Sequence, residues 1–138
     1  MSNTSNKNRV YKDGRTFWGV IKTMMEELKI EQEKQKFIPE DLNLKVGYKM
    51  DDIDFNHTVI IEEGNILAKE GILDDADVVI KVSSQMFHDM NIGKISSMQA
   101  LTSSLFEFEK GDMGKVLLAG TMPTMIYYRK ACEIHCIK

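Results

Sequence analysis

The sequence predicts an α+β fold, in which a five-stranded, mostly antiparallel sheet carries about five helices over one face. Two observations indicate this class. The spacing of apolar residues is helical before Pro39 and alternates with a period of two after it. Several predicted strands then follow one another directly, which favours antiparallel pairing over the strict strand and helix alternation of a parallel sheet.

The first predicted helix runs from about residue 15 to 35. Its apolar stripe consists of Phe17, Val20, Ile21, Met24 and Leu28. Trp18 lies on the same segment, so the helix could serve as a dimer or membrane-surface contact, although covering the sheet is the commoner role of such a stripe.

Three short strands are predicted next. Residues 42–50 alternate apolar and polar side chains, and residues 57–63 and 66–69 flank a Glu-Glu-Gly-Asn turn. Three aspartates at 74, 75 and 77 lack the ligand register and distal glutamate of a calcium loop, so we expect a solvated turn there. Residues 78–83 form the fourth predicted strand.

The second half predicts helices around one more strand. Ser84 is expected to cap a short helix that ends at Gly93, and Ser96 or Ser97 to open another. Residues 105–110 place Phe106 and Phe108 on one strand face. Two more helices are then expected, the first capped by Asp112 and the last carrying Pro123 in its first turn.

Length and composition indicate one globular domain. The chain has 138 residues, 43% hydrophobic and 28% charged, and a net charge of -3 gives no reason to expect nucleic-acid binding. No apolar run approaches the roughly 20 residues of a membrane-spanning helix. We expect a disordered tail at 1–12, a domain at 13–138, a cytoplasmic location and at most peripheral membrane contact.

The segment from residue 76 to 120 resembles the signature half of the sterol carrier protein type-2 family. The residues that carry the resemblance are Ala76, Asp77, Ile80, Phe87, Gly93, Lys94, Ala100, Gly111, Asp112, Met113 and Gly114. The preceding turn at Glu63 and Gly64 also suits that family. Two features depart from it: Ser104 and Leu105 stand where members commonly have a Gly-Lys pair, and many members end before residues 121–138.

The resemblance implies an apolar tunnel that binds, and can transfer, a fatty acid, a sterol or another amphiphile without chemistry or a cofactor. The predicted tunnel-lining residues are Met86, Phe87, Met90, Ile92, Met98, Leu101, Phe106, Phe108, Met113, Leu117, Met122 and Ile126. Ten methionines in this short chain independently favour an adaptable apolar cavity, because the thioether side chain follows ligands of different shape. A homodimer is also compatible with the sequence.

Two other functions stay open. An accessory module that presents a lipid-like substrate to a partner enzyme would have the same fold and a larger exposed apolar face. An enzyme acting on lipids would need a catalytic motif, and the sequence contains no nucleophile elbow, phosphate loop or dinucleotide fingerprint. His57, His88 and His135 are scattered, and His88 beside Asp89 is interpreted as a surface histidine rather than a base.

Cys132, His135 and Cys136 form a Cys-x-x-His-Cys cluster near the end of the sequence. As a metal site it lacks an obvious fourth ligand, and a disulfide between positions i and i+4 of a helix has poor geometry. We therefore expect two free thiols and no metal, which suits a reducing compartment.

Overall fold

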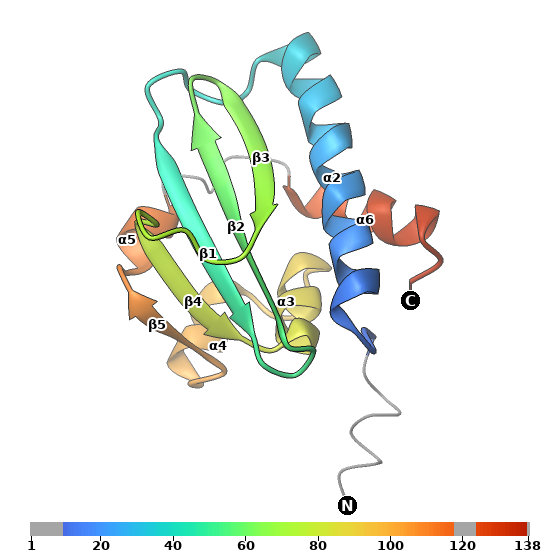
Figure 1. Cartoon of the computed structure of the whole chain (residues 1–138), viewed down its shortest axis with the longest axis vertical. Coiled ribbons are helices and arrows are strands. Elements are labelled where there is room, and N and C mark those ends of the chain that lie inside the picture. Colours follow the sequence, from blue (N-terminus) through green and yellow to red (C-terminus); the bar gives the residue numbers. More distant parts are fainter. Residues whose placement is uncertain (1–9, 118–123, 138) are drawn as a thin grey trace, which may run out of the picture.

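A computed structural model describes residues 10–117 and 124–137, which form an open five-stranded sheet with helices on one face (Figure 1). The described helices are α2 (Gly14–Gln35), α3 (Ser84–Asn91), α4 (Ser97–Thr102), α5 (Met113–Leu117) and α6 (Thr124–Ile134). The strands are β1 (Leu44–Met50), β2 (Phe55–Glu62), β3 (Asn65–Glu70), β4 (Val78–Val82) and β5 (Phe106–Lys110). In this part of the chain, no helix has the length and apolar character needed to cross a membrane.

The sheet has the strand order β3-β2-β1-β4-β5. Three neighbouring pairs are antiparallel, and β1 pairs with β4 in parallel. The prediction of a mostly antiparallel α+β sheet is therefore confirmed. The parallel pair requires the chain to cross from one edge of the sheet to its interior, and residues 71–77 make this crossover.

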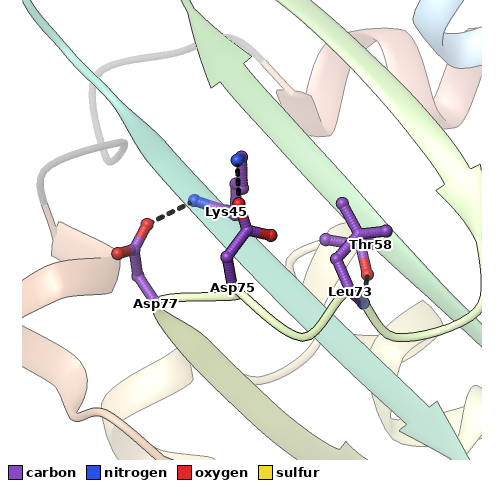
Figure 2. Close-up of polar contacts among 5 residues, drawn as sticks. All are labelled: Lys45, Thr58, Leu73, Asp75 and Asp77. Atoms are coloured by element: carbon purple, nitrogen blue, oxygen red, sulfur yellow. Dashed lines mark hydrogen bonds and ion pairs between the residues drawn. The ribbon is translucent and has the colours of Figure 1, made fainter.

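The crossover is fastened to the sheet face opposite the helices, as Figure 2 shows. The Thr58 hydroxyl donates to the carbonyl of Gly71 at 2.8 Å and accepts from the Leu73 amide at 3.2 Å. The Asp77 carboxylate accepts from the Lys45 amide at 2.9 Å, and the Asp75 carboxylate pairs with the Lys45 ammonium. Two of the three clustered aspartates thus hold the crossover on β1.

Gly47 explains how the crossover comes so close to β1. A β-carbon at this position would lie 2.9 Å from Cδ1 of Ile72, on the crossover, and 3.6 Å from a methyl of Val79 on the neighbouring strand. A larger residue would force the Ile72 side chain to shift. Gly47 faces the crossover, whereas its larger neighbours on β1, Val46 and Tyr48, face the helices and the cavity.

Helix α2 follows its predicted stripe closely. Asp13 caps it by accepting from the Thr16 amide at 2.8 Å. Its buried face comprises Phe17, Trp18, Val20, Ile21, Met24, Met25 and Leu28. Trp18 is 9% exposed, and its ring lies 5.6 Å from that of Phe55. Of the two roles left open for Trp18, the structure shows packing against the sheet.

The prediction that the disordered tail extends to residue 12 is wrong at Tyr11. Tyr11 is fully buried, packs edge-on against Phe17, and shares a 2.7 Å hydrogen bond between its hydroxyl and that of Tyr128. A large aromatic residue gains most of its stabilisation by burial, so this segment joins the domain. Residues 1–9 lie outside the described residues, and a tail there stays a prediction.

Two expectations for α3 are also corrected. Ser83, not Ser84, caps the helix, because the Ser84 amide and hydroxyl both donate to the carboxylate of Asp52. His88 is 3% exposed instead of lying on the surface, because α6 packs against α3 and brings the Tyr128 hydroxyl to 2.7 Å from its Nδ1.

The other predicted caps are confirmed where the structure describes them. Ser96 opens α4 through a capping box with Gln99. The Asp112 carboxylate accepts from the Lys115 amide at 3.3 Å at the start of α5. Pro123, expected in the first turn of the last helix, lies outside the described residues.

Candidate functional site

A cavity of about 490 Å³ lies between the sheet and the helices. The sheet contributes Leu44, Val46, Tyr48, His57, Val59, Ile61, Ile66, Ile80, Phe106 and Phe108. Side chains two residues apart on a strand share a face, so the alternation that was read from the sequence directs these residues to one side. All five strands therefore form the floor of the cavity.

The helices form its remaining walls. Their lining side chains are mostly apolar: Ile21, Met24, Met25, Phe87, Met90, Met113, Val116, Met125 and Ile126. Five of these nine are methionines, whose flexible side chains can adapt to different apolar shapes. The volume falls within the roughly 300–1,000 Å³ typical of small-molecule sites.

The cavity reaches the molecular surface beside the start of α6. Met125 and Ile126 line the cavity, yet they are 39% and 62% exposed. An apolar side chain that is both exposed and part of the lining marks a point where interior and solvent meet.

The polar part of the lining is uncharged. It consists of Tyr48, His57, Asn91, Ser97 and Thr124, and the lining formed by residues 10–117 and 124–137 includes no Asp, Glu, Lys or Arg. An ion transferred into such a cavity would lose its hydration without gaining an opposite charge. The cavity therefore suits a neutral or largely apolar molecule.

His57 is the most unusual member of the lining. It is fully buried, and neither ring nitrogen has a hydrogen-bond partner. Its ring stacks on that of Tyr48, with centroids 5.0 Å apart and planes 16° from parallel, and Phe55 and Phe87 also flank it. Burial lowers the pKa of His57 to about 3, so the ring is neutral at physiological pH, and burial raises the pKa of Tyr48 to about 12.

The structure brings six of the twelve predicted tunnel residues to this cavity: Phe87, Met90, Phe106, Phe108, Met113 and Ile126. Four others lie elsewhere. Met98 is 55% exposed, Met86 lines a separate hollow between α3 and α4, and Ile92 and Leu101 pack beside the core without reaching the cavity. The side chain of Leu117 and all of Met122 lie outside the described part of the structure.

The sequence interpretation missed the lining from β1, β2 and α2, which includes His57. The signal was present, since Leu44, Val46 and Tyr48 share one strand face and Met24 belongs to the predicted apolar stripe. The twelve predicted residues all belong to the second half of the chain, whereas the cavity lies between segments that are distant in the sequence. No feature of the sequence near His57 distinguishes it from an ordinary core residue.

A second buried polar group lies outside this cavity. The Tyr128 hydroxyl bonds both Tyr11 and His88, and the Tyr11 hydroxyl lies 3.8 Å from Sγ of Cys132. Burial raises the pKa values of both tyrosines and of the Cys132 thiol and lowers that of His88. These groups are thus neutral, and their hydrogen bonds connect the segment before α2 to α3 and α6.

The three side chains of the Cys-x-x-His-Cys cluster lie in different environments. Cys132 is buried and Cys136 exposed, and both are free thiols. Nε2 of His135 instead bonds the Thr23 hydroxyl at 2.7 Å on α2. Within the described residues, no group of three or more His, Cys, Asp or Glu side chains could hold a metal ion.

Solved structures resemble this fold. A crystal structure of sterol carrier protein 2 superposes with a TM-score of 0.59 at 15% identity, covering 83% of this chain and 94% of that one. Sterol carrier protein 2 from Aedes aegypti, solved with palmitate, gives 0.55 at 12% identity and covers 79% and 93%. These similarities confirm the sterol carrier protein 2 fold that residues 76–120 predicted.

A longer protein also contains this fold. The inverting sec-alkylsulfatase Pisa1 from Pseudomonas sp. matches with a TM-score of 0.58 at 15% identity, over 71% of this chain. The present chain spans only 15% of that enzyme's length. No protein-family model matches the sequence, and no curated protein is detectably similar.

Proposed function

We propose that this chain binds a fatty acid, a sterol or a related amphiphile in the cavity between the sheet and the helices. The observation that carries the proposal is the uncharged, methionine-rich cavity of about 490 Å³ with an exposed apolar edge at Met125 and Ile126. The palmitate complex of the Aedes aegypti protein, which has the same fold, supports it. Transfer of the ligand between membranes would use the same edge.

The energetics of such binding are favourable without a charged anchor. Each buried methylene gains about 0.8 kcal/mol, so an acyl chain of about a dozen carbons gains roughly 10 kcal/mol. Part of this gain offsets the lost translational freedom and chain flexibility of the ligand. A dissociation constant near the micromolar range, or about -8 kcal/mol, follows.

The proposal assigns no catalytic step to this chain. The titratable side chains of the described lining are His57 and Tyr48, which burial keeps neutral. The two free thiols fit the reducing cytoplasm, where we place the protein.

A pair of methionine variants tests the binding site. Met90 lines the cavity and is half-buried, whereas Met98 lies on the next helix and is 55% exposed. We expect Met90→Trp to weaken binding of a fluorescent fatty acid at least about tenfold by filling the cavity, and Met98→Trp to leave it unchanged. Circular dichroism would confirm that both variants fold.

Native mass spectrometry of the purified protein provides the complementary measurement. We expect a copurifying amphiphile at near-stoichiometric level in the wild type and less in Met90→Trp. A protein that copurifies with no such molecule and binds neither a fluorescent fatty acid nor a fluorescent sterol would refute the proposal.

The second candidate is an accessory module that holds an apolar substrate for an enzyme. The alkylsulfatase favours it, because there the fold forms part of a longer enzyme chain. Exposed Met125 and Ile126 would then contact the partner as well as the ligand. For an accessory module, Ile126→Ser should weaken delivery of the substrate to such an enzyme more than it weakens equilibrium binding of the substrate. For a simple carrier, the variant should reduce substrate delivery and substrate binding to the same extent.

A further inference from the structure

His57 and Tyr48 place two polar groups side by side in the mostly apolar lining of the cavity. They are directly opposite each other on the antiparallel strands β1 and β2, so both side chains lie on the cavity face. The stacked rings, 5.0 Å apart, make them one unit, which we call the His57–Tyr48 pair. The pair occupies the sheet floor beneath α2 and α3.

The polar atoms of the pair have no partner among the described residues. Both nitrogens of His57 are unpaired, and Tyr48 makes ring contacts with His57 and Phe87 but no hydrogen bond. Buried polar groups in native proteins are nearly always hydrogen-bonded, so a group left unpaired beside a cavity points to a ligand. By contrast, buried His88 is paired with Tyr128.

The chemistry of the pair selects the ligand group. A neutral imidazole offers one N–H donor and one acceptor nitrogen, and a phenol can do both as well. An alcohol hydroxyl is likewise a donor and an acceptor, and it carries no charge. A carboxylate only accepts, and the described lining holds no cation to pair with it.

We propose that the natural ligand carries an uncharged hydroxyl that binds at the His57–Tyr48 pair, so that the cavity selects alcohols over carboxylates. This inference rests on the proposed function, because it requires an amphiphile in the cavity. The polar end of the ligand then lies inside the protein, and its apolar end lies toward the opening at Met125 and Ile126. His57 is thereby a residue that determines specificity.

The test compares ligands that differ only in this group. Hexadecanol, its methyl ether and palmitate would each displace a fluorescent apolar probe from the wild type and from His57→Phe. We expect the wild type to prefer the alcohol to the ether about tenfold, which is about 1.4 kcal/mol. In His57→Phe the alcohol should lose this advantage while the affinity for the ether is retained.

Two further variants separate the hydrogen bond from the shape of the cavity. Tyr48→Phe should reduce the alcohol preference in part, and it serves as the second variant if His57→Phe does not fold. Val59→Ala enlarges the cavity without changing a polar group, so it should change the affinities for the alcohol and the ether equally. A cholesterol arm distinguishes a sterol from a linear alcohol as the source of the hydroxyl.

The outcomes separate this inference from the proposed function. Equal displacement by alcohol and ether in the wild type, or tighter binding of ionised palmitate than of hexadecanol, would overturn the hydroxyl site but leave lipid binding intact. An unchanged preference in both His57→Phe and Tyr48→Phe would also overturn it. Failure of every ligand to displace the probe would refute the proposed function itself.

Discussion

Replacing His57 with phenylalanine should make the folded protein less sensitive to acid. The residue is fully buried without a hydrogen-bond partner, and burial lowers its pKa from 6.5 to about 3. Between these two pH values, the unfolded chain binds a proton at this position and the folded protein does not. Stability from this group is therefore fully present above about pH 6.5 and is lost as pH falls.

The size of the effect follows from the pKa difference. At about pH 5 the unfolded histidine is almost wholly protonated and the folded one almost wholly neutral, which costs the folded state about 2 kcal/mol relative to about pH 7.5. Phenylalanine cannot take up a proton and keeps the stacking with Tyr48 and Phe55. The variant should also lose the penalty of unpaired nitrogens, so its stability at neutral pH should equal or exceed that of the wild type.

Urea denaturation at about pH 7.5 and about pH 5 measures the effect. The wild type should lose about 2 kcal/mol more than His57→Phe between the two conditions, with unchanged m-values. His88→Gln is a useful comparison, because burial lowers that pKa too and the sign is the same. Equal acid sensitivity of the wild type and His57→Phe would refute the reasoning that a neutral, unpaired His57 lies in the core.

Three further predictions concern other parts of the fold. Tyr128→Phe removes a buried hydroxyl, leaves Nδ1 of His88 without its partner and leaves the Tyr11 hydroxyl with only the Cys132 sulfur, so unfolding free energy should fall by about 1–3 kcal/mol in urea denaturation. Gly111→Ala should lower the free energy of unfolding by about 2 kcal/mol or more, because φ is 78° and a β-carbon would lie 2.7 Å from the Asp77 carbonyl oxygen. Gly71→Ala is the control: φ is 85°, but the added β-carbon would meet open space, so the loss should be about 1 kcal/mol. A maleimide should label exposed Cys136 rapidly and the buried thiol only after denaturation, and equal rates would contradict the burial.

The local elements were predictable because their signals lie in neighbouring residues. The alternation at residues 42–50 predicted β1 and the face that it turns toward the helices, and the stripe starting at Phe17 predicted the buried face of α2. The capping roles of Ser96 and Asp112 were also readable, because a cap and the amide that it accepts from are only three residues apart.

Long-range pairing was not readable in the same way. The parallel pairing of β1 with β4 depends on the crossover at residues 71–77 and on the space that Gly47 leaves for Ile72. Likewise, Tyr11 was assigned to a tail because its partner, Tyr128, lies 117 residues away. Neither contact has a local signature, since each depends on two segments that meet only after folding.

The sequence by itself determined the fold class, the order of the elements and the family resemblance, because periodicity, caps and the string from residue 76 to 120 are local properties of the chain. Only the tertiary structure decided which faces enclose the cavity, and it placed His57 beside Tyr48 in the lining and His88 against Tyr128. The same residue type is thus unpaired in one place and paired in another. The physical reason is that burial and hydrogen bonding depend on the neighbours that packing supplies, and strand register and helix docking choose those neighbours.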